Sequence, residues 1–236
     1  MIRDLFYRIP SPTIRALLPG LLLTAAGAFA FWRVLDHFLD RDDIYLLDQP
    51  ALNWLASIRE DWLTAVLTWI TNAFGPGILP ILVGVACAVW GKVSGGWRDP
   101  LLLVSAMAMS TVIAVVVKMI VARPRPAGSL QVIPRLEASY SFPSGHTAGA
   151  ATLVLVAAYL LWRHRRNGRS LAWWLVASTG IIALVGGSRL YLGYHFVTDV
   201  LAGVCLGVVT LGVVVAASRR LDLRQRRAAA APPPPA

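Results

Sequence analysis

Residues 188–218 read SRLYLGYHFVTDVLAGVCLGVVTLGVVVAAS, a polar block followed directly by an uncharged stretch over 200–218. An apolar stretch of this length can cross a bilayer as a helix. The block before it contains Arg189, His195 and Asp199, and ionisable side chains are costly at membrane depth. The sequence therefore predicts a transmembrane helix with a group of functional residues at one end.

The whole chain has the composition of a membrane protein. Of its 236 residues, 57% are hydrophobic and only 14% are charged, against about 25% charged residues in a soluble domain. Six uncharged stretches are long enough to cross, or nearly cross, a bilayer: Ala16–Trp32, Trp62–Gly91, Pro100–Val117, Ala138–Trp162, Ser170–Ser188 and Val200–Ser218. The second is longer than one span needs, so we expect its start to be a loop or interfacial turn around Asn72–Pro76. The predicted fold is an all-α polytopic membrane protein, with six transmembrane helices in one bundle.

The distribution of charge predicts the topology. Residues 1–15 are expected to form a cytoplasmic N-terminal segment, residues 16–218 the six-span domain, and residues 219–236 a basic, proline-rich and disordered cytoplasmic tail. Lys and Arg residues concentrate at the termini and in the two even loops, where the acids are Asp4, Asp99 and Asp222. Because cytoplasmic segments are enriched in Lys and Arg, both termini are predicted to be cytoplasmic. This topology accounts for the net charge of +10 without a nucleic-acid partner.

The external segment Asp36–Asp61 is acidic and carries apolar residues at helical spacing: Leu47, Ala51, Trp54, Leu55 and Ile58. This pattern predicts an amphipathic helix on the membrane surface, which either covers the bundle or gates substrate entry. His37 in this segment and His164 in a cytoplasmic loop are expected to be surface residues. Cys87 and Cys205 fall inside predicted spans, so no disulfide framework is expected.

Three polar blocks are expected on the same external rim of the bundle. They are Lys118–Pro126 (KMIVARPRP), Pro143–His146 (PSGH) and Ser188–Asp199. The two prolines after Lys118 should end the third span, and Ser144 is a natural N-cap for the fourth. His195 and Asp199 are four residues apart, a spacing that places both on one face of a helix.

Each polar residue also has a simpler explanation. Lys118 could extend to the headgroup region, Arg123 could contact headgroups, and Asp199 could cap a helix. Taken together on one rim, the fixed cations suit a phosphate group, and the two histidines can transfer protons or attack phosphorus. The set therefore favours an active site over separate structural roles.

These motifs resemble the type 2 phosphatidic acid phosphatase superfamily of integral membrane lipid phosphatases. The family pattern has three parts: Lys, six residues, Arg-Pro; Pro-Ser-Gly-His; and Ser-Arg, five residues, His, three residues, Asp. The chain matches them with Lys118 to Pro126, Pro143 to His146, and Ser188 to Asp199. The six-span arrangement is similar to that of bacterial members, so the resemblance covers all but the two ends.

The resemblance implies a role for each site residue. His195 would attack phosphorus and form a phosphohistidine, oriented by Asp199, while His146 would protonate the leaving oxygen and later activate water. The phosphoryl oxygens would be bound by Lys118, Arg125, Ser144, Gly145 and Arg189. Three fixed cations can stabilise a phosphoryl transition state, and the sequence shows no set of ligands typical of a metal site. We therefore expect a metal-independent hydrolase with no cofactor.

An active site on the external rim suits a lipid whose phosphate lies at headgroup level. The expected location is a bacterial cytoplasmic (inner) membrane, with the site facing the periplasm or exterior. Undecaprenyl diphosphate is the favoured substrate, followed by phosphatidylglycerol phosphate and phosphatidate. A phosphotransferase that passes the phosphate to another lipid, such as lipid A, remains an alternative, and a transporter that uses the buried charges is a more distant one. The sequence leaves the oligomeric state open.

Overall fold

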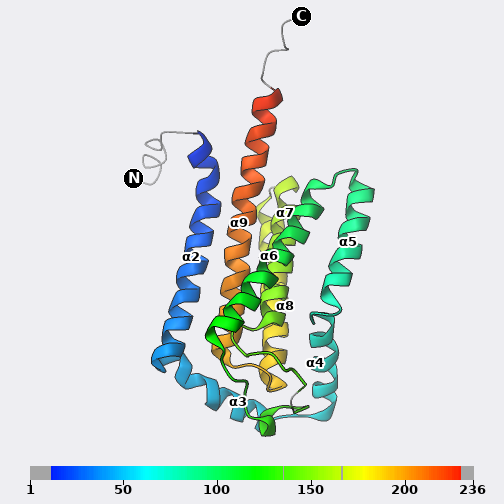
Figure 1. Cartoon of the computed structure of the whole chain (residues 1–236). Coiled ribbons are helices and arrows are strands. Elements are labelled where there is room, and N and C mark those ends of the chain that lie inside the picture. Colours follow the sequence, from blue (N-terminus) through cyan, green and yellow to red (C-terminus); the bar gives the residue numbers. More distant parts are fainter. Residues whose placement is uncertain (1–11, 135, 166, 230–236) are drawn as a thin grey trace, which may run out of the picture.

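The computed structural model describes residues 12–134, 136–165 and 167–229, and all of their regular secondary structure is helical. The elements are α2 (Pro12–Asp40), η1 (Asp43–Leu47), α3 (Asp48–Ser57), α4 (Asp61–Ala73), α5 (Leu79–Ser94), α6 (Arg98–Val121), η2 (Gly128–Leu130), α7 (Gly145–Arg165), α8 (Gly168–Tyr191) and α9 (Val197–Ala229). The predicted all-α class is confirmed. The long helices run side by side as one bundle (Figure 1).

Five of these helices, α2, α6, α7, α8 and α9, are long and apolar enough to cross a membrane, and α5 is a shorter apolar helix. The long second stretch of the sequence is divided between α4 and α5, which are stacked along the bundle (Figure 1). Its start is therefore a helix and not the expected loop. The turn itself lies where it was expected, because α4 ends at Ala73 and the Gly75 N–H donates to Asn72 O at 3.0 Å.

Helix α7 packs closely on α9, and small residues make this possible. A Cβ atom placed on Gly207 would lie 2.5 Å from Ala151 Cβ, and one on Gly203 would lie 2.8 Å from Ser144 O. Such distances exclude any side chain at these positions without a shift of the helices. Close helix packing at small residues is common in membranes, and here it fixes the beginning of α7 against the first turns of α9.

One end of the bundle carries both ends of the described chain. The start of α2 and the end of α9 lie at one end (Figure 1), where Arg98 Nη1 is 2.7 Å from Asp222 Oδ1. Residues 219–229, expected to be part of a disordered tail, continue α9 as a helix. Residues 1–11 and 230–236, which make up the rest of the two predicted terminal segments, lie outside the described residues.

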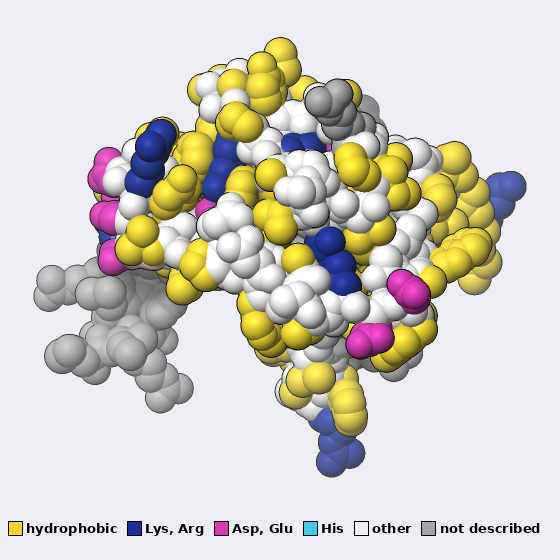
Figure 2. All heavy atoms as spheres, turned by 90° about the horizontal axis from the view of Figure 1, so that it is seen from below, with side chains coloured by type: hydrophobic (Ala, Val, Ile, Leu, Met, Phe, Trp, Pro, Cys, Tyr) yellow, Lys and Arg dark blue, Asp and Glu magenta, His cyan; other side chains and the backbone are white. Residues whose placement is uncertain are grey.

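The opposite end carries α3 and the loop between α6 and α7 (Figure 1). Helix α3 confirms the helix predicted in the acidic segment, although Leu47 belongs to η1 and Ile58 follows the helix. Leu52 is only 1% exposed whereas Trp54 is 62% exposed. The helix therefore covers the bundle with one face and leaves an apolar face outward. On this end of the molecule, the basic side chains stand apart from one another among hydrophobic and neutral ones (Figure 2).

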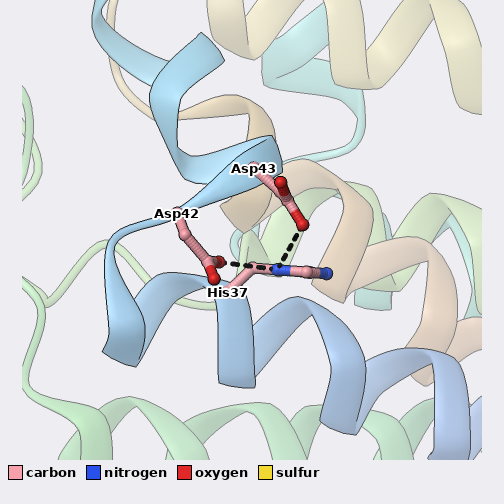
Figure 3. A group of neighbouring side chains, drawn as sticks. All are labelled: His37, Asp42 and Asp43. Atoms are coloured by element: carbon pink, nitrogen blue, oxygen red, sulfur yellow. Dashed lines mark hydrogen bonds and ion pairs between the residues drawn. The ribbon is translucent and has the colours of Figure 1, made fainter.

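The prediction that His37 is a surface residue is wrong. Its side chain is buried at the end of α2, where Nδ1 lies 2.8 Å from Asp42 Oδ1 and 3.6 Å from Asp43 Oδ2 (Figure 3). Both acids belong to the acidic segment Asp36–Asp61, and the sequence pattern there did not indicate this grouping. His164 is exposed, as expected, and its Nε2 lies 2.7 Å from Asp99 Oδ2.

Candidate active site

The first part of the site is built where α6 ends. Helix α6 stops at Val121, and Ala122 adopts the left-handed conformation (φ 48°) with its N–H donating to Lys118 O. This is a common helix ending, and the two prolines that follow prevent the helix from continuing. Lys118 Nζ then lies 2.6 Å from Tyr140 O, and Arg125 Nε lies 2.7 Å from Ser139 O. Both predicted cations therefore face the segment that precedes α7.

The turn between α8 and α9 positions His195. Gly193 has a φ of +79°, and a Cβ atom there would lie 1.9 Å from Leu130 O, so the turn requires glycine. Because α9 begins only at Val197, His195 precedes the helix instead of sharing a helical face with Asp199 as expected. The turn still brings the two together, with His195 Nδ1 3.4 Å from Asp199 Oδ2.

The other ring nitrogen of His195 faces a cation. His195 Nε2 lies 3.4 Å from Arg125 Nη1, and the His195 side chain is 1% exposed. With Nδ1–H donating to Asp199, Nε2 carries the lone pair. Burial lowers the pKa of His195 well below 6.5, and the charges of Arg189, Arg125 and Lys118 lower it further. The imidazole is therefore neutral at neutral pH, which is the form that can act as a nucleophile.

Asp199 is held by several groups. Its Oδ1 accepts from Arg123 Nη1 at 2.7 Å, and its Oδ2 accepts from the Phe196 N–H at 2.9 Å and from the Ser141 hydroxyl. Arg123 also lies 2.7 Å from Asp48 Oδ2 and stacks over the Phe196 ring at 4.0 Å. Arg123 is thus a buried partner of the acid that orients His195, and not the headgroup contact considered above.

The start of α7 supplies the second histidine. Ser144 caps this helix as predicted, since its Oγ accepts from the Thr147 N–H at 3.4 Å. A Cβ atom on Gly145 would lie 4.0 Å from Lys118 Cε, which places the backbone of Gly145 beside this cation. His146 is half-buried against the turn between α4 and α5, where a Cβ atom on Gly75 would lie 3.4 Å from its Nε2.

The third predicted cation, Arg189, is 2% exposed and binds a residue that the sequence analysis did not select. Its Nη2 donates to Glu137 Oε1, and Glu137 Oε2 lies 2.6 Å from Arg125 Nη2. Burial alone would raise the pKa of Glu137, but the charges of Arg189 and Arg125 lower it to about 2. Glu137 is therefore charged, and the site residues from three blocks surround it.

The fold and these motifs agree with a known family, because residues 99–222 match the PAP2 superfamily. The chain belongs to this superfamily. It is 34% identical over 190 residues to phosphatidylglycerophosphatase B of Bacillus subtilis, covering 79% of this chain and 90% of the relative. It is also 30% identical over 100 residues to undecaprenyl-diphosphatase BcrC of the same organism, covering 42% of this chain and 47% of the relative.

A solved PAP2 structure has the same fold. The transmembrane PAP2-type phosphatidylglycerolphosphate phosphatase from Bacillus subtilis superposes with a TM-score of 0.70 and 28% sequence identity, covering 87% of this chain and 96% of that chain. The predicted family and fold class are thus confirmed, and the comparisons place the chain among membrane lipid phosphatases.

Two acids that contact the site residues were not predicted from the sequence, for different reasons. Glu137 directly precedes the fourth uncharged stretch, and its position between two polar blocks was a usable signal. Asp48 is one of several acids in the segment Asp36–Asp61, and nothing in its spacing separates it from the exposed ones. Its burial, 2% exposed, depends on the contact between α3 and the start of α9, where Thr198 donates to it.

Proposed function

We propose that this protein hydrolyses a lipid-linked phosphate or diphosphate through a phosphohistidine formed on His195. The observation that carries the proposal is the environment of the His195 ring, with Nδ1 toward Asp199 and Nε2 toward Arg125, both at 3.4 Å. Distances of this size in a free enzyme commonly shorten when substrate binds. A neutral, oriented imidazole beside fixed cations is suited to attack on phosphorus.

The proposed reaction has two steps. His195 Nε2 attacks phosphorus, a P–N bond forms, the P–O bond to the lipid breaks, and His146 donates a proton to the departing oxygen. Neutral His146 then takes a proton from water, whose oxygen attacks phosphorus and breaks the P–N bond. Inorganic phosphate leaves, and both histidines return to their starting forms.

Fixed positive charge would stabilise the transition state. Phosphoryl transfer requires positioning and charge neutralisation more than covalent assistance. Lys118, Arg125 and Arg189 surround the segment that contains Glu137, and their protonated side chains can hold the three non-bridging oxygens together with Ser144 and the Gly145 N–H. We therefore propose that the reaction needs no metal ion.

An apolar cavity beside the α4–α5 turn, which contacts His146, supports a lipid substrate. The cavity has a volume of about 230 Å³ and is lined by Ala73, Phe74, Leu79, Leu82, Val83, Ala86, Leu103 and Leu153. Phe74 immediately precedes Gly75, which lies against His146. A lipid tail in this cavity would place its oxygen near the residue that we expect to protonate it.

Two candidate substrates gain support from relatives. The phosphatidylglycerophosphatase covers most of the chain, which favours phosphatidylglycerol phosphate, and the shorter match to an undecaprenyl-diphosphatase keeps undecaprenyl diphosphate as the second candidate. Phosphatidate would fit the same site chemistry. From the charge distribution we propose that both termini are in the cytoplasm and that the site faces the outer side of an inner membrane.

Purified protein in detergent and a panel of lipid monophosphates and diphosphates would test the function. Phosphate release is expected for at least one lipid, and His195→Asn should abolish it. His164→Asn is a matched control, because His164 is exposed at the other end of the bundle. Parallel reactions with an acceptor lipid would reveal a phosphotransferase. Retention of turnover in His195→Asn would show that the nucleophile is a different group.

A further inference from the structure

The carboxylate of Glu137 connects two of the three cations proposed to bind phosphate. One oxygen accepts from Arg189 Nη2, and the other lies 2.6 Å from Arg125 Nη2. Two carboxylate oxygens held by two guanidinium groups reproduce the way in which such groups hold two oxygens of a phosphate. Glu137 thus occupies donors that a substrate phosphate would need.

The residues that follow Glu137 accept hydrogen bonds from Lys118 and Arg125. Lys118 Nζ donates to Tyr140 O at 2.6 Å and to Ser141 O at 3.3 Å, while Arg125 donates to Ser139 O at 2.7 Å. The segment 137–141 therefore provides acceptors for all three cations. The carbonyl groups are neutral, so the carboxylate is the member of this segment that neutralises charge in the site.

Arg189 retains an unused donor beside the carboxylate. It is 2% exposed, its Nη1 donates to Thr71 Oγ1 at 3.1 Å, and its Nε has no hydrogen-bond partner. Nε and Nη2 form the side-on edge of a guanidinium group, the edge that binds two oxygens of one anion. A buried donor without a partner is costly. Glu137 accepts from only one of the two nitrogens of this edge, Nη2, as expected if the edge binds a larger anion.

The Glu137 side chain is more exposed to solvent than the arginine and the histidine beside it. The Glu137 side chain is 22% exposed, whereas Arg189 is 2% and His195 is 1% exposed. Residues 136–141 are not part of a helix, so this segment can move without breaking helical hydrogen bonds. A phosphate that binds Arg189 through both Nε and Nη2 would have to displace Glu137.

We propose that Glu137 is an internal competitor for the phosphate site, bound in the free enzyme and displaced by the phosphate of the substrate. This inference rests on the proposed function for the identity of the anion. The competition weakens the binding of every anion equally, but a lipid phosphate gains additional affinity from its tail. The ratio of the two affinities is unchanged, but free phosphate, which has no tail, is left weakly bound. The return of Glu137 to the arginines therefore helps to expel the inorganic product.

The charge of Glu137 supports displacement over protonation as the way to open the site. Its pKa of about 2 lies below the ordinary value of 4.5 because of Arg189 and Arg125, although burial acts in the opposite direction. A group with a lowered pKa keeps its charge, and the interaction that this charge makes, until the pH falls through the lowered value. The competitor is thus fully charged across the working range of pH.

Binding of inorganic phosphate tests the inference directly. Isothermal titration calorimetry would compare wild type, Glu137→Gln and Glu60→Gln in the same detergent. Glu60 is exposed on the same external side, so its replacement removes the same charge without touching the arginines. Loss of a charge-assisted contact of about 1.5–3 kcal/mol predicts about 10- to 100-fold tighter phosphate binding in Glu137→Gln. Glu60→Gln should bind phosphate as wild type does.

Two further comparisons keep the outcome decisive. Glu137→Ala, which cannot retain a hydrogen bond to either arginine, should also bind phosphate more tightly, and phosphate should inhibit both variants more strongly than it inhibits wild type. Unchanged or weaker binding in both variants, with wild-type elution on size exclusion, would show that Glu137 only orients the arginines. Tighter binding in protein that hydrolyses no lipid phosphate would uphold the competitor and reject the proposed function.

Discussion

Arg123 Nη1 donates to Asp199 Oδ1 at 2.7 Å, and the two side chains are 5% and 0% exposed. The same guanidinium group reaches Asp48 Oδ2 at 2.7 Å, and Asp48 Oδ1 accepts from the Thr198 N–H at 2.9 Å. Helix α3 on the rim is thereby connected to the acid that orients His195. Asp48 therefore links Arg123 to the start of α9 through charge-assisted hydrogen bonds, which are stronger than neutral ones.

The first prediction concerns Asp48. Asp48→Asn should lower the free energy of unfolding by about 1.5–3 kcal/mol, because it removes the charge-assisted hydrogen bond to Arg123 while the Arg123–Asp199 pair remains. Arg123 would then be held mainly by Asp199, and both side chains would shift. We expect kcat to fall while KM stays close to the wild-type value. Thermal unfolding in detergent and steady-state kinetics would measure the two effects. Asp40→Asn is the control, because Asp40 is exposed on the same end. A variant with lower stability but normal kcat would limit Asp48 to a structural role.

Much of the site could be predicted because its chemistry lies in short local motifs. Lys118, Arg125, His146 and Arg189 stand at helix ends that hydropathy alone can locate. The remaining partners depend on tertiary folding: Asp48 is about 150 residues from its partner Thr198, and no local pattern specifies that pairing. The position of His195 before α9 was also missed, since the four-residue spacing suits a helix and a tight turn equally well.

The fold was predictable to a similar extent. Long uncharged stretches give the transmembrane helices directly, because length and charge are decided by the bilayer. The prediction for Trp62–Gly91 was wrong at the start of the stretch, where α4 is a helix and not a loop. Hydropathy does not separate a helix from an apolar turn. The continuation of α9 to Ala229 was also missed: charge marks the end of the membrane but not the end of a helix.

The second prediction is a pH profile set by His195. Burial and the neighbouring cations hold its pKa well below 6.5, so the neutral nucleophile persists as the pH falls and is lost only near the lowered pKa. If His195 had the ordinary histidine pKa of about 6.5, kcat/KM would fall about tenfold between neutral pH and about pH 5.5. We expect a much smaller loss after the profile is corrected for the second ionisation of the substrate phosphate, at about pH 6. An acid limb with a midpoint near 6.5 would contradict the environment described for this ring.

The third prediction is independence of metal ions. Because Lys118, Arg125 and Arg189 can neutralise the phosphoryl group, phosphate release should be as fast in excess chelator as it is without chelator. Vanadate, which adopts the five-coordinate geometry of the transition state, should inhibit. The assay is phosphate release after dialysis against chelator, with and without added Mg²⁺. Activity that disappears in chelator and returns with Mg²⁺ would require a different source of positive charge.

The fourth prediction concerns the apolar cavity beside His146. Ala86→Trp should fill much of the 230 Å³ cavity that Ala86 lines, and so lower kcat/KM for long-chain lipid phosphates by about tenfold or more, the loss expected for roughly two buried methylene groups. Hydrolysis of p-nitrophenyl phosphate, which has no tail, should change little. Ala88→Trp is the matched control, since Ala88 is also exposed on α5 but does not line the cavity. Equal losses on both substrates would indicate a distorted site instead of a blocked tail.

The last prediction separates the two histidines by the leaving group. A lipid monophosphate expels an alkoxide, which needs a proton, whereas p-nitrophenyl phosphate expels a much weaker base. General acid catalysis contributes about 10²–10⁴-fold. His146→Ala should therefore lose a factor of this order on the lipid and much less on the aryl ester, while His195→Ala should lose activity on both.

This difference between the histidines is visible only if formation of the phosphohistidine limits the rate, because His146 would also activate water in the second step. Rapid-mixing measurements of p-nitrophenol release decide the point: no burst is expected when formation is slow. If formation limits the rate and His146→Ala still reduces both reactions equally, the imidazole does not protonate the leaving oxygen. Its position against the α4–α5 turn would then assign it to binding or orienting the phosphate.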